Sequence, residues 1–323
     1  MNLHWGILGA AAIATRSVIP AILSVPGNTL AGIGSRTMQK GAEAARGFDC
    51  RAYDGYDALL QDETINAVYI PLPTGMHHEW VLKALQAGKH VLVEKAAAVN
   101  SAEAAEMTAL SREKNLALVE NFQFTRHSQH NAVKKLLAEG AIGELRCFRA
   151  SFGFPPFDAE TNIRYQKKLG GGALLDAGAY TLRVASFFLG ENLQVAAARL
   201  VENPEMGVDW YGGAFLTRKD SPVFAELAFG FDNFYQCNYE LWGSKGKLTA
   251  TRAYTARADF QPSILLEQGS GTEEIKLPAD DHFRKMILHF GQTIAEGNLE
   301  PERQNILTQA ALIEATRRTA TGT

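Results

Sequence analysis

The chain has 323 residues, 46% of them hydrophobic, which is more than one ordinary core requires and indicates two domains. Its 32 basic and 35 acidic residues leave a formal charge of -3, so neither nucleic acid nor an anionic membrane is an expected partner. The three cysteines are far apart and form no CxxC pair, which argues against a disulfide framework or a zinc site and favours reduced thiols in the cytoplasm.

The first 122 residues alternate short apolar runs with segments of helical periodicity. No basic leader precedes the first run and no apolar stretch is long enough to span a membrane, so we expect a soluble, unexported protein. Continuous apolar strands separated by helices predict a parallel sheet covered on both faces. Residues 1–122 are therefore predicted to form a doubly wound nucleotide-binding domain. The predicted strands are HWGILGA, TLAGIGSR, AVYIPLP and HVLVEK, with helices from about Ile13, from about Thr37, at 79–87 and at 102–114.

Residues 123–323 are predicted to form an α+β domain around one large, mainly antiparallel, open sheet. Turns containing Gly, Pro, Asp or Asn separate its strands, and closing helices at about 283–296 and 305–318 could pack back toward the first domain. Helices are expected on one face of this sheet only, which would leave the other face exposed to solvent. We therefore expect a homodimer or homotetramer in which this second face forms the interface. The predicted strands are 144–154, VAAARLVEN, YGGAFLTR, VFAELAFGF, QCNYELWG and SILLEQ, with further helices at about 130–139 and 173–188.

The turn after the first strand has the position of a dinucleotide loop but a poor fingerprint. Gly9 lacks a side chain and would let the backbone approach a pyrophosphate at the start of a helix. The usual GxGxxG spacing falls on Gly9, Ala11 and Ala14, so two of the three glycines are replaced. By itself the motif is equally compatible with a plain strand-to-helix turn.

The end of the second strand favours NADP(H) over NAD(H). An NAD-specific fold usually places a carboxylate here for the ribose hydroxyls, whereas this chain has Ser35 and Arg36, with Lys40 one helical turn further. A hydroxyl, a guanidinium and an ammonium together suit a 2′-phosphate. The alternative is that these are solvated turn residues, and NAD(H) remains possible.

Two histidines follow the third strand exit, in PLPTGMHHEW. His77 and His78 lack both an i,i+4 partner and a nearby cysteine cluster, so no metal site is predicted. The exit itself, with Pro71, would lie at the carboxyl edge of the sheet, where nucleotides bind in such folds. These residues are therefore expected to line the cofactor cleft.

Two segments carry candidate chemistry. The apolar run VLVEK ends on Glu94 and Lys95, and the helix of GGGALLDAGAY carries Asp176 and Tyr180 four residues apart, on one face. A phenol near a lysine ammonium has its phenolate favoured, so it can deliver a proton to a carbonyl oxygen while hydride arrives at carbon. The alternative is a core helix on which Tyr180 satisfies its hydroxyl locally and Asp176 caps or pairs with Arg183.

Over essentially its full length the chain resembles the Gfo/Idh/MocA oxidoreductases (glucose-fructose oxidoreductase/inositol dehydrogenase). The matching stretches are WGILGAAAIA, AGIGSR, AVYIPLPTGMHHEWVLKALQAGKHVLVEK, VENFQF and GGGALLDAGAYTLR. The resemblance implies an N-terminal Rossmann domain, Lys95 and Tyr180 as catalytic residues and Asp176 as a substrate or orienting residue. Ala96 stands where the family has a proline, and because a cis bond before alanine costs about 2.5–4 kcal/mol, a trans bond is expected.

Within the family the chain looks most like nucleotide-sugar 3-ketoreductases that use NADPH. The resemblance implies hydride transfer to or from a sugar carbonyl or hydroxyl, with a dihydrodiol or free aldose dehydrogenase as the enzymatic alternative. A non-catalytic dinucleotide- or sugar-binding regulatory protein is the alternative from another class. The implied cofactor residues are Gly9, Ala10, Ala12, Ile13, Ser35, Arg36, Lys40, Pro71, Leu72, Thr74, His77, Glu94, Lys95 and Asn121, and the implied substrate residues are Gln123, Asn162, Arg164, Tyr165, Asp176 and Tyr180.

Overall fold

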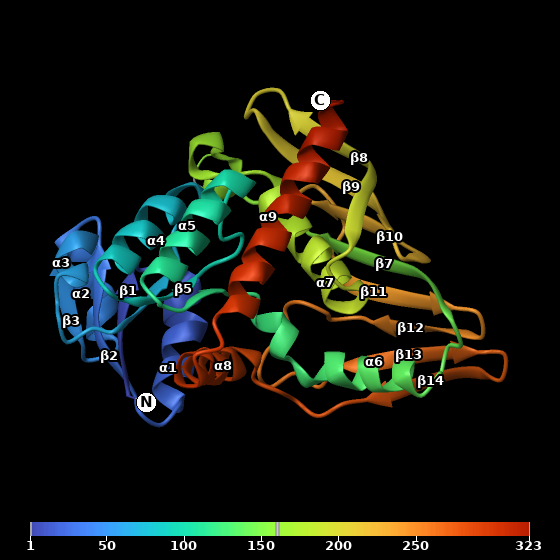
Figure 1. Cartoon of the computed structure of the whole chain (residues 1–323), viewed down its shortest axis with the longest axis horizontal. Coiled ribbons are helices and arrows are strands. Elements are labelled where there is room, and N and C mark those ends of the chain that lie inside the picture. The colour runs from blue at the N-terminus through green and yellow to red at the C-terminus, as the bar shows by residue number, and fades with distance from the viewer. Residues whose placement is uncertain (1, 159, 161, 323) are drawn as a thin grey trace. The chain divides into compact units, whose positions relative to one another are not determined.

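The structure is a computed structural model that describes residues 2–158, 160 and 162–322. The chain divides into two compact units (Figure 1). The first comprises Met1–Asn121 and Phe283–Ala310, and the second comprises Phe122–His282 and Ala311–Thr323. The closing part of the chain therefore contributes to both units.

The first unit is built on a six-stranded parallel sheet, which confirms the predicted doubly wound fold. Its strand order is β3-β2-β1-β4-β5-β6, and every neighbouring pair is parallel. The order changes direction at β1, so the carboxyl ends of β1 and β4 border the point where such sheets bind ligands. The strands are β1 (Leu3–Leu8), β2 (Asn28–Ser35), β3 (Arg51–Asp54), β4 (Ala67–Ile70), β5 (His90–Val93) and β6 (Leu118–Glu120).

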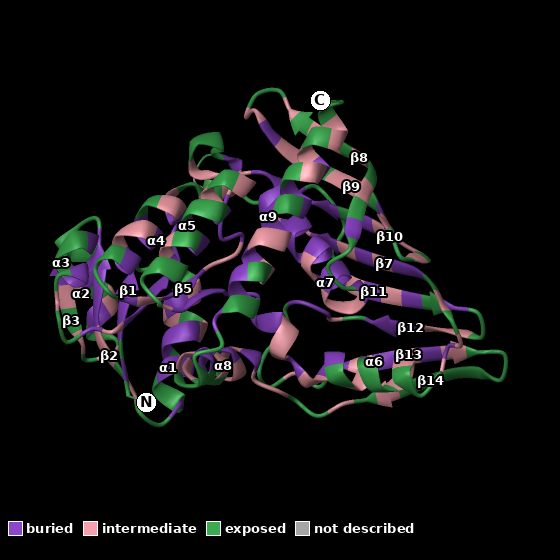
Figure 2. Cartoon of the chain, viewed as in Figure 1, coloured by how far each residue is buried: buried purple, intermediate pink, exposed green. Residues whose placement is uncertain are grey.

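Helices cover both faces of this sheet because alternate strand residues point to opposite sides. On β4, Val68 and Ile70 belong to one buried cluster, whereas Ala67 and Tyr69 belong to another. Figure 2 shows that burial concentrates on the strands and on the inner sides of the helices. The helices are α1 (Ile19–Ser24), α2 (Met38–Arg46), α3 (Tyr56–Leu60), α4 (His77–Gln86), α5 (Ser101–Glu113), α8 (His282–Glu296) and the first part of α9 (Glu300–Thr321).

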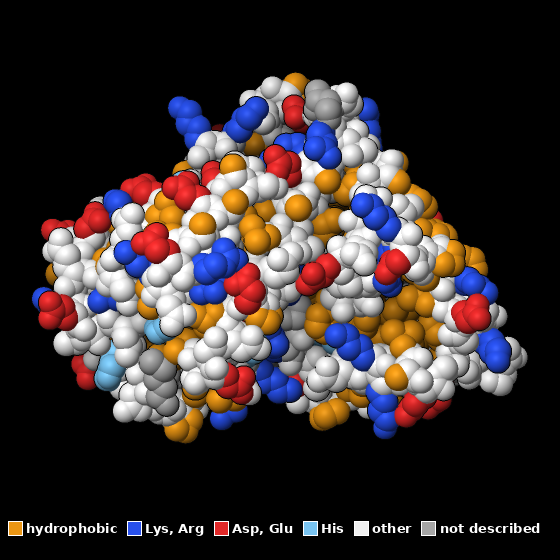
Figure 3. Space-filling view, viewed as in Figure 1, with side chains coloured by type: hydrophobic (Ala, Val, Ile, Leu, Met, Phe, Trp, Pro, Cys, Tyr) orange, Lys and Arg blue, Asp and Glu red, His pale blue; other side chains and the backbone are white. Residues whose placement is uncertain are grey.

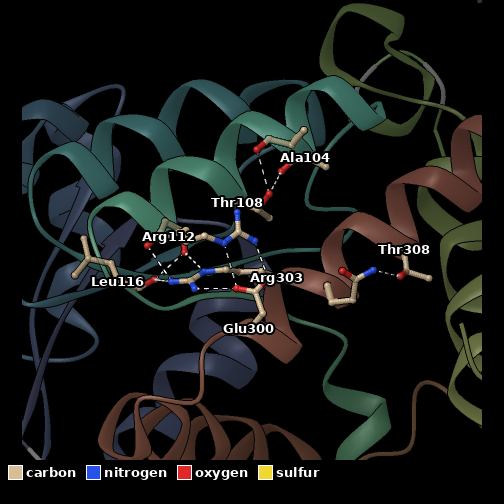
Figure 4. Close-up of polar contacts among 10 residues, drawn as sticks. Ala104, Thr108, Arg112, Leu116, Glu300, Arg303 and Thr308 are labelled. Carbon is tan, nitrogen blue, oxygen red and sulfur yellow. Dashed lines mark hydrogen bonds and ion pairs between the residues drawn. The ribbon is translucent and has the colours of Figure 1, made fainter.

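A buried arginine fastens α9 to the end of α5 (Figure 4). The Arg303 guanidinium donates to the Ser111 hydroxyl and carbonyl, each at 3.0 Å, and pairs with Glu300 at 3.2 Å. Glu300 also accepts from Arg112 at 2.6 Å. The guanidinium thus occupies carbonyl groups that the end of a helix leaves without a partner.

The second unit contains an eight-stranded open sheet in the order β14-β13-β12-β11-β7-β10-β9-β8. All neighbours are antiparallel except β7 and β10, which run parallel, so the prediction of a mainly antiparallel sheet is confirmed. The strands are β7 (Leu145–Gly153), β8 (Leu193–Asn203), β9 (Val208–Arg218), β10 (Ser221–Gly230), β11 (Gln236–Gly243), β12 (Gly246–Ala250), β13 (Ser263–Gln268) and β14 (Gly271–Lys276).

One face of this sheet is covered by α6 (Ser128–Ala138) and α7 (Ala179–Leu189), which continues from a π-helical turn, η6 (Leu174–Gly178). On β7 the side chains of Phe148 and Phe152 are buried against this layer, whereas Arg149, on the opposite face, is partly exposed. Aromatic rings therefore form much of the core under α7.

The surface carries both signs of charge. Figure 3 shows acidic and basic side chains interspersed over the visible face, in keeping with the formal charge of -3. Within the described residues no helix combines the length and the apolar character that crossing a membrane requires.

Candidate active site

The turn after β1 is shaped for close approach of a ligand to the backbone. Gly9 has φ +122°, and a Cβ atom added there would lie 3.1 Å from Leu72 Cδ2. Ala10 and Ala12 after it are exposed, and Ile13 leads into a π-helical turn, η1 (Ala14–Val18), before α1. Glycine is therefore required at the first position of the weak fingerprint. The small side chains of Ala10 and Ala12 leave the surface of the turn accessible to a ligand.

The end of β2 presents cations without a carboxylate among them. Ser35 is buried at the last strand position, and Arg36 and Lys40 are exposed, with no hydrogen bond or ion pair from either side chain in the described residues. The Thr37 hydroxyl caps α2 by accepting from the Lys40 backbone N–H at 3.5 Å. This arrangement offers a guanidinium, an ammonium and a helix start to a phosphate.

His77 links two strand exits from inside the protein. It is fully buried, with Nε2 2.7 Å from the Leu72 carbonyl oxygen and Nδ1 2.9 Å from the Ala96 carbonyl oxygen. Both partners are acceptors, so they favour a ring that donates from both nitrogens, but burial outweighs them and lowers the pKa of His77 to about 4. The neutral ring therefore holds the turn after Lys95 beside the exit of β4.

The expectation of a trans bond before Ala96 is wrong, because the Lys95–Ala96 peptide bond is cis. The peptide unit that follows it, Ala96–Ala97, is fixed by hydrogen bonds at both its carbonyl and its N–H. The Ala96 carbonyl faces His77, and the Ala97 N–H donates to Glu120 Oε1 at 2.7 Å. Residues distant in sequence, His77 and Glu120, thus fix the backbone that follows Lys95.

Glu94 is a half-buried residue whose carboxyl group is held by two neighbouring strands. Its Oε1 accepts from the Tyr69 hydroxyl at 2.6 Å and from Asn121 Nδ2 at 2.5 Å. Burial raises the pKa of Glu94 above its ordinary value. These hydrogen bonds and the adjacent Lys95 charge act in the opposite direction and offset only part of the rise. Glu94 thus joins the carboxyl ends of β4, β5 and β6, from which Lys95 emerges partly exposed. Pro71 is buried and Thr74 half-buried at the neighbouring exit.

In the second unit, the glycine turn before α7 is explained by close backbone approaches. A Cβ on Gly171 would lie 2.5 Å from the Arg164 carbonyl oxygen, and one on Gly172, at φ +121°, would lie 2.3 Å from Asp209 Oδ1. Asp209 Oδ2 in turn accepts from the Leu174 N–H at 2.6 Å, at the start of η6. Sequence reasoning missed Asp209, and its distance along the chain leaves no pattern that could have revealed it.

Asp176 forms an ion pair with Arg164, in which Nε donates to Oδ2 at 2.6 Å. Arg183, the partner considered from the sequence, lies with its guanidinium 5.9 Å from the centre of the Phe122 ring. Tyr180 is 8% exposed, and its ring packs against Phe122, Phe124, Phe152 and Tyr254 at centroid distances of 5.7, 5.7, 5.0 and 5.5 Å. Asp176 belongs to η6 and Tyr180 to the first turn of α7, so a π turn separates them.

The other expected substrate residues differ in their surroundings. Asn162 Oδ1 accepts from the Arg164 N–H at 3.1 Å, so it shapes the segment that carries Arg164. Tyr165 is 5% exposed, and its hydroxyl accepts from the Phe157 N–H at 2.9 Å, which makes it a support for the same segment. Gln123 and Asn121 each have a buried side-chain oxygen without a hydrogen-bond partner in the described residues. Such orphaned oxygens suit a polar ligand.

We expect acid to destabilise both units through buried histidines. Burial lowers the pKa of His77 to about 4 and that of His130, which contacts the Tyr239 hydroxyl at 2.9 Å, to about 3, against an ordinary value of 6.5. The unfolded chain binds these protons more readily, so stability is complete above pH 6.5 and falls as the pH drops toward 4. Each of the two histidines should lower the free energy of unfolding by about 2 kcal/mol between pH 7.5 and pH 5. Urea unfolding at the two pH values measures the loss, and equal stability at both would contradict it.

Comparison with family models matches both units to one group of oxidoreductases. Residues 3–122 match the model described as "Oxidoreductase family, NAD-binding Rossmann fold", and residues 130–249 match the GFO/IDH/MocA C-terminal domain. The fold and these matches define an oxidoreductase with a dinucleotide-binding Rossmann domain. The chain belongs to the GFO/IDH/MocA family, which confirms the resemblance inferred from the sequence.

Similar proteins within the family are sugar-nucleotide reductases. A dTDP-3,4-didehydro-2,6-dideoxy-alpha-D-glucose 3-reductase of Saccharopolyspora spinosa is 42% identical over 317 residues, 96% of this chain and 95% of the relative. The enzyme of the same name from Actinomadura kijaniata is 41% identical over 97% of this chain and 94% of the relative. The crystal structure of KijD10, a 3-ketoreductase from Actinomadura kijaniata in complex with NADP and TDP-benzene, has a TM-score of 0.96 at 39% identity, covering 99% and 98% of the two chains.

Proposed function

We propose that this protein is an NADP(H)-dependent ketoreductase that transfers hydride to or from the C3 position of a nucleotide-linked deoxysugar. The observation that carries the proposal is the full-length similarity, at 40–42% identity, to four proteins named dTDP-3,4-didehydro-2,6-dideoxy-alpha-D-glucose 3-reductase. The local geometry supports the cofactor part independently, because the end of β2 carries Ser35 and Arg36 in place of a carboxylate.

The residues of the first unit fit a dinucleotide phosphate. Gly9 provides the backbone approach, Ser35, Arg36 and Lys40 suit the 2′-phosphate, and the polar groups at the ends of β4, β5 and β6 suit the nicotinamide end. When bound, NADP(H) supplies or accepts the hydride at nicotinamide C4. The full set that would hold it is Gly9, Ala10, Ala12, Ile13, Ser35, Arg36, Lys40, Pro71, Leu72, Thr74, Glu94, Lys95 and Asn121.

Lys95 and Tyr180 would together serve the proton transfer to or from the substrate oxygen. In ketone reduction the substrate oxygen gains one proton as its carbon gains hydride, and in the reverse reaction the oxygen loses that proton. We assign the proton exchange to the Tyr180 hydroxyl and assign to the Lys95 ammonium the tasks of polarising the oxygen and favouring the phenolate. Asp176, engaged by Arg164, would orient the substrate rather than take the proton.

The deciding experiment is a substrate panel. Purified protein is mixed with NADPH or NADH and, separately, with nucleotide-linked 3-keto sugars, free aldoses and dihydrodiols, while absorbance at the reduced-nicotinamide band is recorded. The proposal expects NADPH to be oxidised with the nucleotide-linked keto sugar alone. Reduction of NADP⁺ by a free aldose or a dihydrodiol, without activity on the keto sugar, would contradict it and identify a different dehydrogenase.

We further propose that the chain forms a homodimer or homotetramer in the cytoplasm through the open face of the second sheet. On that face Phe215 and Phe224 stack at 5.1 Å and Trp242 is 49% exposed. A second copy would remove these rings from water. The free thiols of Cys50, Cys147 and Cys237 are compatible with a reducing compartment. Sedimentation of the purified protein tests the assembly, and a monomer at micromolar concentration would refute it.

A further inference from the structure

The loop between β12 and β13 carries an arginine that is held by two aromatic side chains. The Arg252 guanidinium lies 5.2 Å from the centre of the Tyr235 ring and 5.6 Å from the centre of the Phe260 ring, and its Nη1 donates to the Tyr235 hydroxyl. The Arg252 carbonyl oxygen accepts from Gln129 Nε2 at 3.1 Å. Arg252 as a whole is partly exposed, so its backbone and side chain are fixed without being closed off from solvent.

No carboxylate among the described residues forms an ion pair with this guanidinium. Its side-chain contacts are the two rings and the Tyr235 hydroxyl. The one acidic residue of the loop 251–262, Asp259, is engaged by the exposed Arg257, whose Nε and Nη2 donate to it at 3.1 and 3.0 Å. Arg252 therefore offers a positive charge that is held in place but not neutralised, which is the form that binds an anion from solution.

The Tyr235 hydroxyl that accepts from Arg252 is itself fixed by neighbours. It lies 3.1 Å from the Thr255 hydroxyl, which in turn lies 3.4 Å from Cys237 Sγ. Burial raises the pKa of Tyr235, so its hydroxyl keeps its proton at neutral pH. The group that holds the guanidinium thus adds no negative charge beside it.

The same loop packs against Tyr180 within the second unit. The Ala253 N–H donates to the Cys237 carbonyl at 2.7 Å, beside the start of β11. The next residue, Tyr254, is fully buried, and its ring centre lies 5.5 Å from that of Tyr180. Because a chain advances at most about 3.6 Å per residue, the Arg252 backbone lies within about 7 Å of the Tyr254 backbone. Arg252 is therefore close to Tyr180, with Tyr254 as the residue that connects them.

A nucleotide-linked sugar carries its negative charge near the reacting carbon. The nucleoside diphosphate is attached at C1 of the sugar, two ring positions from C3, and a planar guanidinium can bind a phosphate group through two parallel hydrogen bonds. We propose that Arg252 binds the diphosphate of the substrate and that Tyr235 and Phe260 hold its guanidinium ready for this contact. The inference rests on the proposed function for the nature of the substrate, and it assigns a substrate-binding residue that the sequence did not indicate.

The test is the binding of thymidine 5′-diphosphate to protein saturated with NADP⁺, measured by isothermal titration calorimetry. Arg252→Gln should raise the Kd of the diphosphate about 10- to 100-fold, because a charge-assisted contact is lost. The Kd of NADP⁺ for the same variant should stay within a few-fold of the original. Arg252→Lys keeps the charge without the planar fork, so it should raise the Kd of the diphosphate less, and it decides the question if the glutamine variant does not fold.

Arg257→Gln is the matched control, since it removes an exposed, paired arginine of the same loop and should leave both Kd values unchanged. An unchanged Kd of the diphosphate in folded Arg252→Gln, an equal loss of NADP⁺ affinity, or no diphosphate binding by the unaltered protein would overturn the inference, even if the keto sugar is reduced. Diphosphate binding that depends on Arg252, without reduction of any nucleotide-linked 3-keto sugar, would keep the inference and overturn the proposed function. If both hold, Arg252→Gln raises KM for the keto sugar and changes kcat little.

Discussion

Replacing Lys95 with alanine is expected to lower kcat for reduction of the keto sugar by about 10²- to 10⁴-fold, the range typical of lost proton-transfer assistance. Hydrogen bonds fix the backbone on both sides of Lys95, from the Glu94 N–H to the Ile70 carbonyl before it, and from the Ala96 carbonyl to His77 and the Ala97 N–H to Glu120 after it. Its ammonium is thus presented from a rigid strand end, as a group that polarises an oxygen requires. Steady-state rates at saturating NADPH measure the loss.

Binding provides the control for this variant. NADPH fluorescence titration should give a Kd within a few-fold of the original, because the phosphate contacts are assigned to other residues. Lys114→Ala removes an exposed lysine that pairs with its sequence neighbour Glu113 and should leave kcat unchanged. Turnover of Lys95→Ala at the original rate, with intact folding, would exclude Lys95 from the chemistry.

Arg36→Ala should have the second largest effect, on the choice of cofactor. A charge-assisted hydrogen bond to a phosphate is worth about 1.5–3 kcal/mol, so kcat/KM with NADPH should fall about 10- to 150-fold. The kcat/KM value with NADH should change little, because NADH has a neutral 2′-hydroxyl in place of the charged 2′-phosphate that Arg36 would bind. The ratio of the two kcat/KM values is the measured quantity.

A matched control is Arg146→Ala, which removes an exposed arginine paired with Glu144 in the second unit. Its kcat/KM ratio should equal that of the unaltered protein. If Arg36→Ala also kept the original ratio, the end of β2 would not select the 2′-phosphate, and the argument for NADP(H) from this strand would fail.

The fold was predictable wherever hydrophobic periodicity is strong. The four long apolar runs of the first unit became β1, β2, β4 and β5, because strands buried on both faces are apolar throughout. The short β3, RAYD, has one buried residue in four and gave no such signal. In the second unit β12 and β14 were also missed. β12, GKLTA, has only five residues, and β14, GTEEIK, is almost entirely exposed and is recognisable only through its pairing with β13.

The candidate site residues lie on the strand ends and the helix expected from the sequence, but their surroundings were less predictable. Glu94, Lys95 and Tyr180 follow from a charged strand end and from helix spacing. The sequence predicted His77 in the cofactor cleft, whereas the structure buries it between carbonyls 5 and 19 residues away. The bond before Ala96 was expected to be trans from the local residue preference and is cis in the structure. Asp176 pairs with Arg164, which is brought near by a turn whose conformation depends on glycine.

The most direct test of the central claim follows one hydrogen atom. NADPH carrying deuterium at nicotinamide C4 is incubated with the protein and a nucleotide-linked 3-keto deoxysugar, and the product is analysed by mass spectrometry and proton NMR. We predict one deuterium per molecule, bound to C3 of the sugar, with no label after incubation with free aldoses. Deuterium at another carbon, or transfer to a free sugar in preference, would contradict the account.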